Sequence, residues 1–221
     1  MSGSDYMEEK KTLDASGFDT WSSNYDSDVR ESDKEERYPF AAYEKIMDRV
    51  CEILEGVPGH KLLDVGIGTG KLARKLMANG YSVTGVDFSQ NMLNEAAQAN
   101  PDAVLITWDF SKGLPDYIKT HDYSAVLCNY AIHHLTPCEK KTLISDMAKC
   151  LDPEGIIVIG DVMTETLEEM NYAMGKDADL WDEDEYYIIV DEFKKQMSEY
   201  HVEFEKFSYC SGVLVMEPPK K

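Results

Sequence analysis

The chain has few basic residues, and this shortage limits the partners it can have. Lysine and arginine number 22 against 42 aspartates and glutamates, which gives a formal net charge of −20 over 221 residues. A nucleic-acid-binding protein needs a basic surface that neutralises phosphates, and an anionic membrane surface repels so acidic a chain. We therefore expect no nucleic-acid and no membrane partner, and we interpret the acidity as an aid to solubility.

Long apolar runs and paired cysteines are also missing. No segment approaches the ~18 apolar residues of a membrane-spanning helix, and the first residues, MSGSDYMEEKK, contain no apolar signal-peptide core. The five cysteines are scattered and form no CxxC pair, which is typical of reduced thiols rather than of a disulfide framework. The sequence therefore predicts a cytoplasmic protein.

The apolar residues that are present, 43% of the chain, follow alternating strand and helix periodicities. These periodicities predict helices over 39–54, 70–80, 89–100 and 136–151, and strands over 61–65, 81–87, 103–107, 123–129, 155–161, 202–210 and 212–217. Pro39 suits the start of the first helix. Thr136, Pro137 and Glu139 predict a capping box at the start of the last helix.

Strands that alternate with helices need crossover connections, which place the strands in parallel with helices on both faces. The sequence thus predicts a doubly wound, Rossmann-like α/β fold with a mainly parallel seven-stranded sheet. The last two strands, joined by a short Ser-Gly turn, are expected to close it as an antiparallel hairpin. We expect a disordered polar head over 1–16 and a single domain over 17–221.

The stretch LLDVGIGTGK follows the first strand and opens the next helix, a place where glycines let the backbone approach a ligand. It is not a Walker A loop, because Val65 stands at the first glycine position and Leu72 at the final Ser/Thr position. A dinucleotide fingerprint starting at Gly66 would need glycine at the position of Lys71. What remains is the pattern D-x-G-x-G-x-G over 64–70.

Two acids end successive predicted strands, Asp64 just before the glycines and Asp87 after the next strand. A carboxylate at Asp64 would repel a pyrophosphate and suits a ligand with an ammonium group beside a carboxylate. Asp87 is placed to accept hydrogen bonds from both hydroxyls of a ribose. Both acids are expected at the carboxyl ends of neighbouring strands, where open α/β sheets bind ligands.

Four motifs in this order, LLDVGIGTG, GVDFSQNML, WDF and CNYAIHHL, resemble those of class I S-adenosylmethionine-dependent methyltransferases. The chain is similar in more detail to small bacterial methyltransferases of the YrrT type, which share the segment FDTWSSNYD (18–26). The resemblance covers nearly the whole chain. It implies S-adenosylmethionine as cofactor and S-adenosylhomocysteine (SAH) as co-product.

The resemblance implies which residues hold the methionine part of the cofactor. Asp64 would lie near its ammonium group, and Gly66, Gly68 and Gly70 would line its amino-acid tail. Asn129, at the end of the fourth strand, would offer its backbone carbonyl to the same moiety.

The adenosine part is expected further along the same edge of the sheet. By the resemblance, Asp87 takes the ribose, and Phe88 and Met92 pack along the adenine. Asp109 accepts from the adenine amino group, with Phe110 or Trp108 beside the ring. Asp109 could instead cap a turn ahead of SKGLP.

Trp21 and Tyr25 are expected on an N-terminal helix that closes over the cofactor. Their spacing of four residues is equally suited to ordinary core packing.

Acceptor-side residues are expected after the fourth and fifth strands and in the tail, namely Tyr130, His133, His134, Asp161 and Tyr209. Methyl transfer is an in-line displacement, for which the enzyme supplies alignment and a dry site, and a base where the acceptor must lose a proton. The resemblance favours His134 as that base. Alternatively, His134 only shapes the pocket for the acceptor.

For His133 we favour a structural hydrogen bond. Ligation of a metal by the two histidines with Cys138 is disfavoured, because adjacent residues point in different directions and no further ligand spacing supports a zinc site. We therefore expect no metal.

The segment 162–199 stands where such enzymes place a substrate lid. Its acids 182–185 could attract a cationic acceptor, but we favour a solvated first turn of a helix for them.

The sequence predicts a monomeric or weakly dimeric methyltransferase for a small-molecule N, O or S nucleophile. The rivals are a catalytically silent cofactor-binding protein and a protein methyltransferase, although the (D/N)PP(Y/F/W) signature is replaced by NYAI at 129–132.

Overall fold

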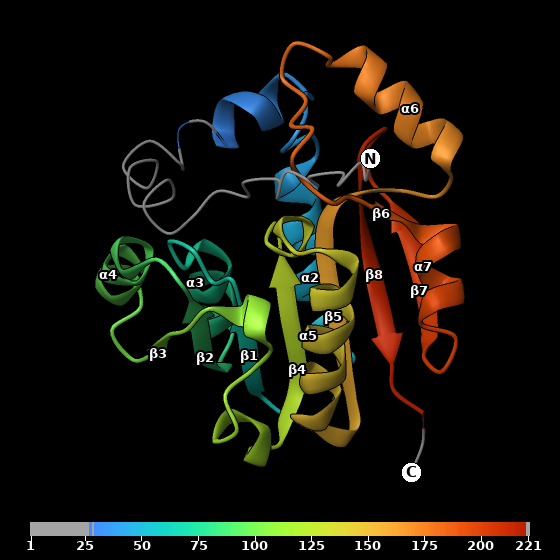
Figure 1. Cartoon of the computed structure of the whole chain (residues 1–221). Helices are drawn as coiled ribbons and strands as arrows, with labels where there is room; N and C mark the ends of the chain where they lie inside the picture. The colour runs from blue at the N-terminus through green and yellow to red at the C-terminus, as the bar shows by residue number, and fades with distance from the viewer. Residues whose placement is uncertain (1–26, 28, 220–221) are drawn as a thin grey trace, which may run out of the picture.

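The structure, a computed structural model, describes residue 27 and residues 29–219. Seven strands form one continuous sheet in the order β3-β2-β1-β4-β5-β8-β7 (Figure 1). Their bounds are β1 (Lys61–Val65), β2 (Ser82–Asp87), β3 (Val104–Thr107), β4 (Tyr123–Asn129), β5 (Leu151–Thr164), β7 (His201–Lys206) and β8 (Ser211–Glu217). The predicted doubly wound sheet is confirmed.

Strand direction follows from the connections. Each neighbouring pair from β3 to β5 is parallel, and α3, α4 and α5 connect β1 to β2, β2 to β3 and β4 to β5, whereas β8 pairs antiparallel with both β5 and β7. The two-residue strand β6 (Ile188–Ile189) lies off this path and pairs with the far end of β5. The chain order reverses between β1 and β4, which is the switch point where α/β sheets leave a crevice for ligands.

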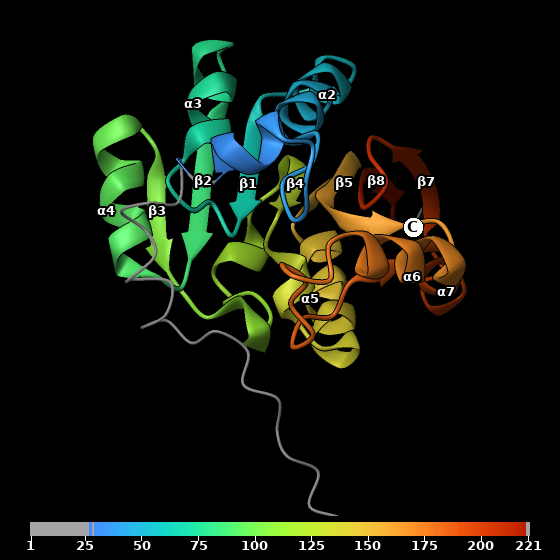
Figure 2. The ribbon, with the colours of Figure 1, turned by 90° about the horizontal axis from the view of Figure 1, so that it is seen from above.

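Helices cover both faces of the sheet. They are α2 (Tyr43–Glu55), α3 (Lys71–Ala78), α4 (Gln90–Ala99), α5 (Pro137–Lys149), α6 (Leu167–Lys176) and α7 (Val190–Gln196). Viewed from above, α2 and α3 lie on one side of the sheet, while α5 and α7 lie on the other (Figure 2).

Both faces of the central strands are buried because their neighbouring side chains point in opposite directions. In β1, Leu62 belongs to the apolar cluster under α2 and α3, and Leu63 belongs to the cluster under α5. In β5 the same division separates Val158 from Ile157. This double burial explains why these strands are continuous apolar runs in the sequence.

Helix starts agree with the local signals where side chains cap them. The Thr136 hydroxyl accepts from the Glu139 N–H, and the Glu139 carboxylate accepts from the Thr136 N–H at 2.8 Å, so the capping box is confirmed. Pro39 was predicted at a helix start, but α2 begins only at Tyr43. Ala42, the residue before the helix, has a left-handed backbone with φ of 64°, so a helix that begins at Pro39 cannot run continuously into α2.

Two further boundaries differ from the expectation. Strand β5 continues to Thr164, so the segment expected to be a lid begins only after that residue. The turn between β7 and β8 consists of residues 207–210, because Ser211 and Gly212 belong to β8. The backbone N–H groups of Phe207 and Ser208 both donate to the Ser211 carbonyl, which sets the turn earlier. In the described part of the chain, no helix combines the length and apolar composition needed to cross a membrane.

Candidate active site at the carboxyl ends of the strands

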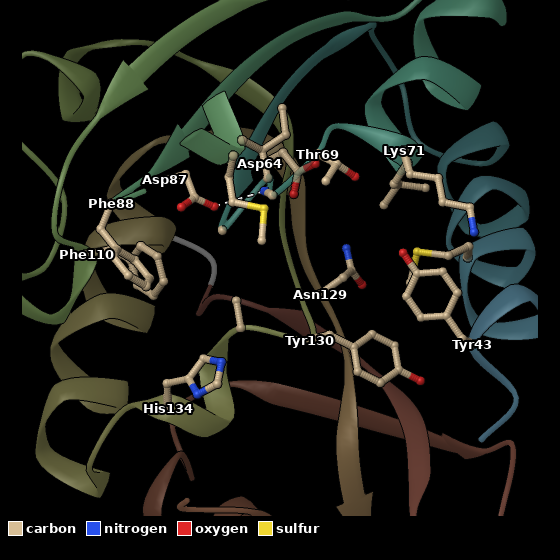
Figure 3. A pocket seen from close by; sticks show the side chains of 17 residues that line it. Tyr43, Asp64, Thr69, Lys71, Asp87, Phe88, Phe110, Asn129, Tyr130 and His134 are labelled. Carbon is tan, nitrogen blue, oxygen red and sulfur yellow. Dashed lines mark hydrogen bonds between the residues drawn. The ribbon is translucent and has the colours of Figure 1, made fainter. Parts of the chain in front are cut away.

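A cavity that is partly open to solvent lies at the switch point beside the ends of β1, β2 and β4 (Figure 3). Ten residues predicted for the site line it: Asp64, Gly66, Gly68, Asp87, Phe88, Met92, Phe110, Asn129, Tyr130 and His134. Residues from four separate motifs are therefore brought to one cavity.

Asp64 and Asp87 form the acidic side of this cavity. Both are buried, with 3% and 5% of their surface exposed. Asp87 accepts hydrogen bonds from the N–H groups of Gly68 and Ser89, each at 2.9 Å. Burial, together with the charge of Asp87, raises the pKa of Asp64 to about 7. A cation bound here would remove that repulsion and favour the ionised carboxylate.

The glycine loop has the left-handed backbone that its composition predicts. Gly66, Gly68 and Gly70 have φ values of 75°, 55° and 73°, which other residues adopt only at a cost. A Cβ on Gly66 would lie 2.4 Å from the Ala131 Cβ, whereas one on Gly68 would meet nothing within 4 Å. Gly68 thus borders open space in the cavity, while Gly66 allows close packing of the loop after β4.

Apolar side chains form the wall beside Asp87. The rings of Phe88 and Phe110 lie 5.8 Å apart in an edge-on arrangement, and both are seen at the same side of the cavity in Figure 3. Ser89 caps α4 by accepting from the Met92 N–H at 3.2 Å, which sets Met92 into the cavity lining. This wall can cover the face of a planar ring.

The end of β4 supplies polar and aromatic groups to the opposite side. The Asn129 amide oxygen accepts from the Gly160 N–H at 2.9 Å, and its buried Nδ2 has no hydrogen-bond partner among the described residues. Tyr130 has a positive φ of 49°, a strained conformation for a tyrosine. Its ring packs at 5.1 Å from that of Tyr43 and closes the cavity wall.

His134 lines the cavity and is held by a carboxylate from a distant segment. Its Nδ1 lies 2.6 Å from Oε1 of Glu185. In Figure 3 one ring nitrogen of His134 points toward the middle of the cavity. Burial and the neighbouring charge of His133 lower the pKa of His134, so the imidazole is neutral near pH 7. With Nδ1–H donating to Glu185, Nε2 is the basic atom.

His133 turns away from the cavity into a buried ion pair. Its Nδ1 lies 2.5 Å from Oδ1 of Asp161, which is fully buried. Asp161 also accepts from the N–H groups of Ile132 and Val162. Burial acts against both charges, yet their mutual attraction prevails, so the pKa of His133 is raised and that of Asp161 is lowered. Neither residue lines the cavity, which agrees with the structural role favoured for His133.

His133, His134 and Glu185 nevertheless approach one another, with one potential ligand atom from each within 4.8 Å of the others. Nδ1 of each imidazole is engaged with a carboxylate at 2.5–2.6 Å. Two ligands of one tetrahedral zinc ion, each at ~2.0–2.1 Å from it, would lie roughly 3.3 Å apart. The two contacts therefore have hydrogen-bond rather than shared-ligand geometry.

Two predicted residues occupy other places in the structure. Asp109 caps the short 3₁₀ turn η1 (Phe110–Lys112) by accepting from the Ser111 N–H and hydroxyl, and it pairs with Lys112. This contact is the capping alternative noted for it. The Tyr209 hydroxyl binds the Asp177 carboxylate and accepts from the Tyr38 N–H. Neither residue lines the cavity, since Asp109 caps its own turn and Tyr209 contacts residues of two distant segments.

Gly70 does not line the cavity. It packs against Asn100, so an added Cβ would clash with that side chain. Trp21 and Tyr25 lie outside the described residues.

Several residues that line the site were not predicted from the sequence: Tyr43, Met47, Ile67, Thr69, Lys71, Leu72 and Ala131. Tyr43 and Met47 share one face of α2, and Lys71 opens α3 and donates to Glu44 at 2.5 Å. The four-residue spacing of Tyr43 and Met47 on a helix is equally typical of ordinary core packing, so it does not by itself indicate a site.

Glu185 was misjudged. Its acidic neighbourhood suggested a solvated helix turn, whereas α7 begins only at Val190 and the Glu185 side chain is 5% exposed. Glu185 is buried because it contacts His134, and no local sequence pattern indicates that contact.

Comparison with known proteins gives the family. Residues 62–155 match the model of a methyltransferase domain. An uncharacterized methyltransferase of Bacillus licheniformis is 35% identical over 160 residues, 72% of each chain. One of Oceanobacillus iheyensis is 30% identical over 200 residues, 86% of this chain and 91% of its own length.

Solved structures share the fold. The DhpI–SAH complex has a TM-score of 0.68 at 16% identity and covers 94% of this chain and 96% of its own. The magnesium protoporphyrin IX methyltransferase of Synechocystis with bound SAH has a TM-score of 0.63 at 20% identity, over 81% and 84% of the two chains. The chain belongs to the class I S-adenosylmethionine-dependent methyltransferases. Within this class it is similar to uncharacterized methyltransferases of Bacillus and related bacteria.

Proposed function

We propose that the protein transfers a methyl group to a small-molecule acceptor, with His134 as the base that receives the acceptor's proton. The observation that carries the proposal is one cavity lined by Asp64, Asp87, the open face of Gly68 and a carboxylate-held His134. The first three groups suit the cofactor, and the last suits a reacting nucleophile.

The residues present fit the cofactor on their own chemistry. Asp64 is a buried carboxylate whose pKa is raised by burial and by the charge of Asp87, and a bound ammonium group would offset both effects. The open space at Gly68 leaves room for a ligand against the backbone. Asp87 would accept from ribose hydroxyls, and Phe88, Met92 and Phe110 would cover the adenine.

When bound, S-adenosylmethionine supplies a methyl group on a positively charged sulfur. The chain's own part is to align the acceptor, exclude water and remove a proton. Glu185 holds the Nδ1–H of His134, so a proton leaving the acceptor is received at Nε2. We further infer that the residues following β5, up to position 199, act as the lid on the acceptor side, since they carry Glu185.

Calorimetry tests the cofactor part, and turnover tests the acceptor part. We expect SAH to bind with micromolar affinity and Asp87→Ala to weaken that binding at least tenfold. A panel of amines, thiols and phenols then tests methyl transfer from S-adenosylmethionine. Binding without turnover of any acceptor would indicate a silent cofactor-binding protein, and methylation of added proteins alone would indicate a protein methyltransferase. An absence of SAH binding would refute the proposal as a whole.

A further inference from the structure

One cationic side chain faces the two acids of the cofactor cavity. Among the described residues that line the cavity, Lys71 is the only lysine or arginine, whereas Asp64 and Asp87 supply two carboxylates. In Figure 3, Lys71 lies on the side of the cavity opposite Phe88 and Phe110, with the two acids between them. A ligand whose ring packs against the two phenylalanines therefore extends past Asp64 toward Lys71.

The ammonium group of Lys71 is held at the cavity wall by contacts on its outer side. Its Nζ lies 4.9 Å from the ring centroid of Tyr43 and 2.5 Å from Oε1 of Glu44. Glu44 also binds Lys75 at 2.9 Å, and Lys75 binds Asp48 at 3.0 Å. The side chains of Glu44 and Asp48 are 42% and 66% exposed, against 15% for Lys71. Water screens the exposed acids, so the more enclosed ammonium keeps its attraction for an anion in the cavity.

A second donor on the same side of the cavity is the side-chain amide of Asn129. Its oxygen accepts from the Gly160 N–H at 2.9 Å, which fixes the orientation of the amide. Its buried Nδ2 has no hydrogen-bond partner among the described residues, and in Figure 3 it points to the side of Thr69 and Lys71. A buried donor without an acceptor is costly, so an oxygen atom of a ligand is favoured there.

We propose that Lys71 and Nδ2 of Asn129 bind the carboxylate of the cofactor's methionine moiety, while Asp64 binds its ammonium group. This inference rests on the proposed methyltransferase function and names the residues that select the cofactor. An ammonium has three N–H donors, and the contact with Glu44 leaves donors of Lys71 for the ligand. The two charges of an amino acid are thereby matched by opposite charges in one cavity. The protein accordingly discriminates against adenine nucleosides that carry the ammonium group without the carboxylate.

The test compares three ligands by calorimetry on the full-length protein at pH 8. They are SAH, its decarboxylated analogue S-adenosyl-3-thiopropylamine, and 5′-methylthioadenosine, which lacks both charged groups. We expect the wild-type protein to bind SAH at least tenfold more tightly than the decarboxylated analogue. Lys71→Met should weaken SAH at least tenfold and change the affinities of the other two ligands less than twofold. Lys75→Met is the matched control, because Lys75 pairs with the same Glu44 but does not line the cavity, and it should leave all three affinities unchanged.

A second variant tests the amide separately. Asn129→Asp keeps an oxygen for the Gly160 N–H and replaces the free donor with a carboxylate oxygen. It should weaken SAH at least tenfold without weakening the decarboxylated analogue, whose ammonium group it attracts.

The outcomes separate this inference from the proposed function. Equal affinities of the wild-type protein for SAH and the decarboxylated analogue would overturn the inference. Equal losses for all three ligands in Lys71→Met would also overturn it, because they would show that Lys71 only supports the shape of the loop. Thermal unfolding reports whether each variant folds, and the wild-type comparison stands where one does not. Failure of the wild-type protein to bind SAH would instead refute the proposed function.

Discussion

Nδ1 of His134 lies 2.6 Å from Oε1 of Glu185, although 51 positions separate the two residues along the chain. The contact joins the turn after β4 to the segment between α6 and β6. It fixes the imidazole so that one nitrogen serves Glu185 and the other is the basic atom. The proposed base is therefore positioned by a carboxylate from a distant segment of the chain.

The pH dependence of turnover tests the role of His134. Its pKa lies below the ordinary 6.5, because burial and the charge of His133 disfavour the imidazolium. We expect kcat at saturating cofactor and acceptor to be constant near pH 7 and to fall as the pH drops below about 6.5, where the imidazole gains a proton.

His134→Gln should lower kcat by about 10²–10⁴-fold and remove this acid limb. His201→Gln, which changes an exposed histidine, is the matched control. An acid limb that persists in His134→Gln would rule out His134 as its source.

Cofactor binding should depend on the ionisation of Asp64. Its pKa of about 7 in the empty site means that an ammonium ligand must bind the minor, ionised form at lower pH. We expect the Kd of SAH, measured by calorimetry, to rise about tenfold for each pH unit below 7. Asp64→Asn should bind SAH weakly at every pH from 5 to 8, without this slope.

The same residue should reduce the stability of the empty protein. A folded-state pKa raised above the unfolded value means that the folded state binds the extra proton, so stability increases as the pH falls from above 7 toward 4. Asp64→Asn should therefore raise the free energy of unfolding at pH 8, by on the order of 1–3 kcal/mol. Equal stability of the two proteins at pH 8 in urea unfolding would contradict this account.

A comparison of Gly68 with Gly80 distinguishes the effect of backbone strain from the effect of filling ligand space. Gly68 and Gly80 both have positive φ, and at both an added Cβ would meet nothing within 4 Å. Gly68→Ala and Gly80→Ala should each lose about 1–2 kcal/mol of stability because of the left-handed backbone. Only Gly68→Ala should weaken SAH binding, by tenfold or more, because only Gly68 lines the cavity. Comparable SAH affinities in the two variants would show that the Gly68 space is not used by the cofactor.

The His133–Asp161 pair should be needed for folding. Removing one partner of a buried ion pair leaves an uncompensated charge and costs about 3–5 kcal/mol, so Asp161→Ala should lose that much in urea unfolding at pH 6. Burial opposes the charge on His133, but Asp161 raises its pKa overall, so the pair stabilises fully below about pH 6.5 and less as the pH rises through the raised pKa. The loss should shrink toward pH 9, whereas Asp116→Ala, at an exposed acid, should be neutral throughout.

The parts of the site that could be predicted are those that a short stretch of chain defines. The D-x-G-x-G-x-G loop needs positive φ at its glycines whatever packs on it, and Asp87 follows a strand that its own apolar run defines. The capping box of Thr136 and Glu139 is likewise closed within four residues. Asp109 shows the limit of such local patterns, since the same residues allowed a ligand contact and a turn cap, and the cap is what forms.

Sequence by itself determined the order of strands and helices up to β5, the closing hairpin, the glycine loop and the two acids at the ends of β1 and β2, because periodicity, backbone conformation and parallel strand direction follow from local residues. It did not predict α6, β6 and α7, which lie between β5 and that hairpin. Only the tertiary structure decided that His133 pairs with Asp161 while His134 faces the cavity. It alone buried Glu185 against His134 and placed Tyr43 and Lys71 at the cofactor side. These outcomes depend on contacts between distant segments, whose burial and charge balance no local pattern records.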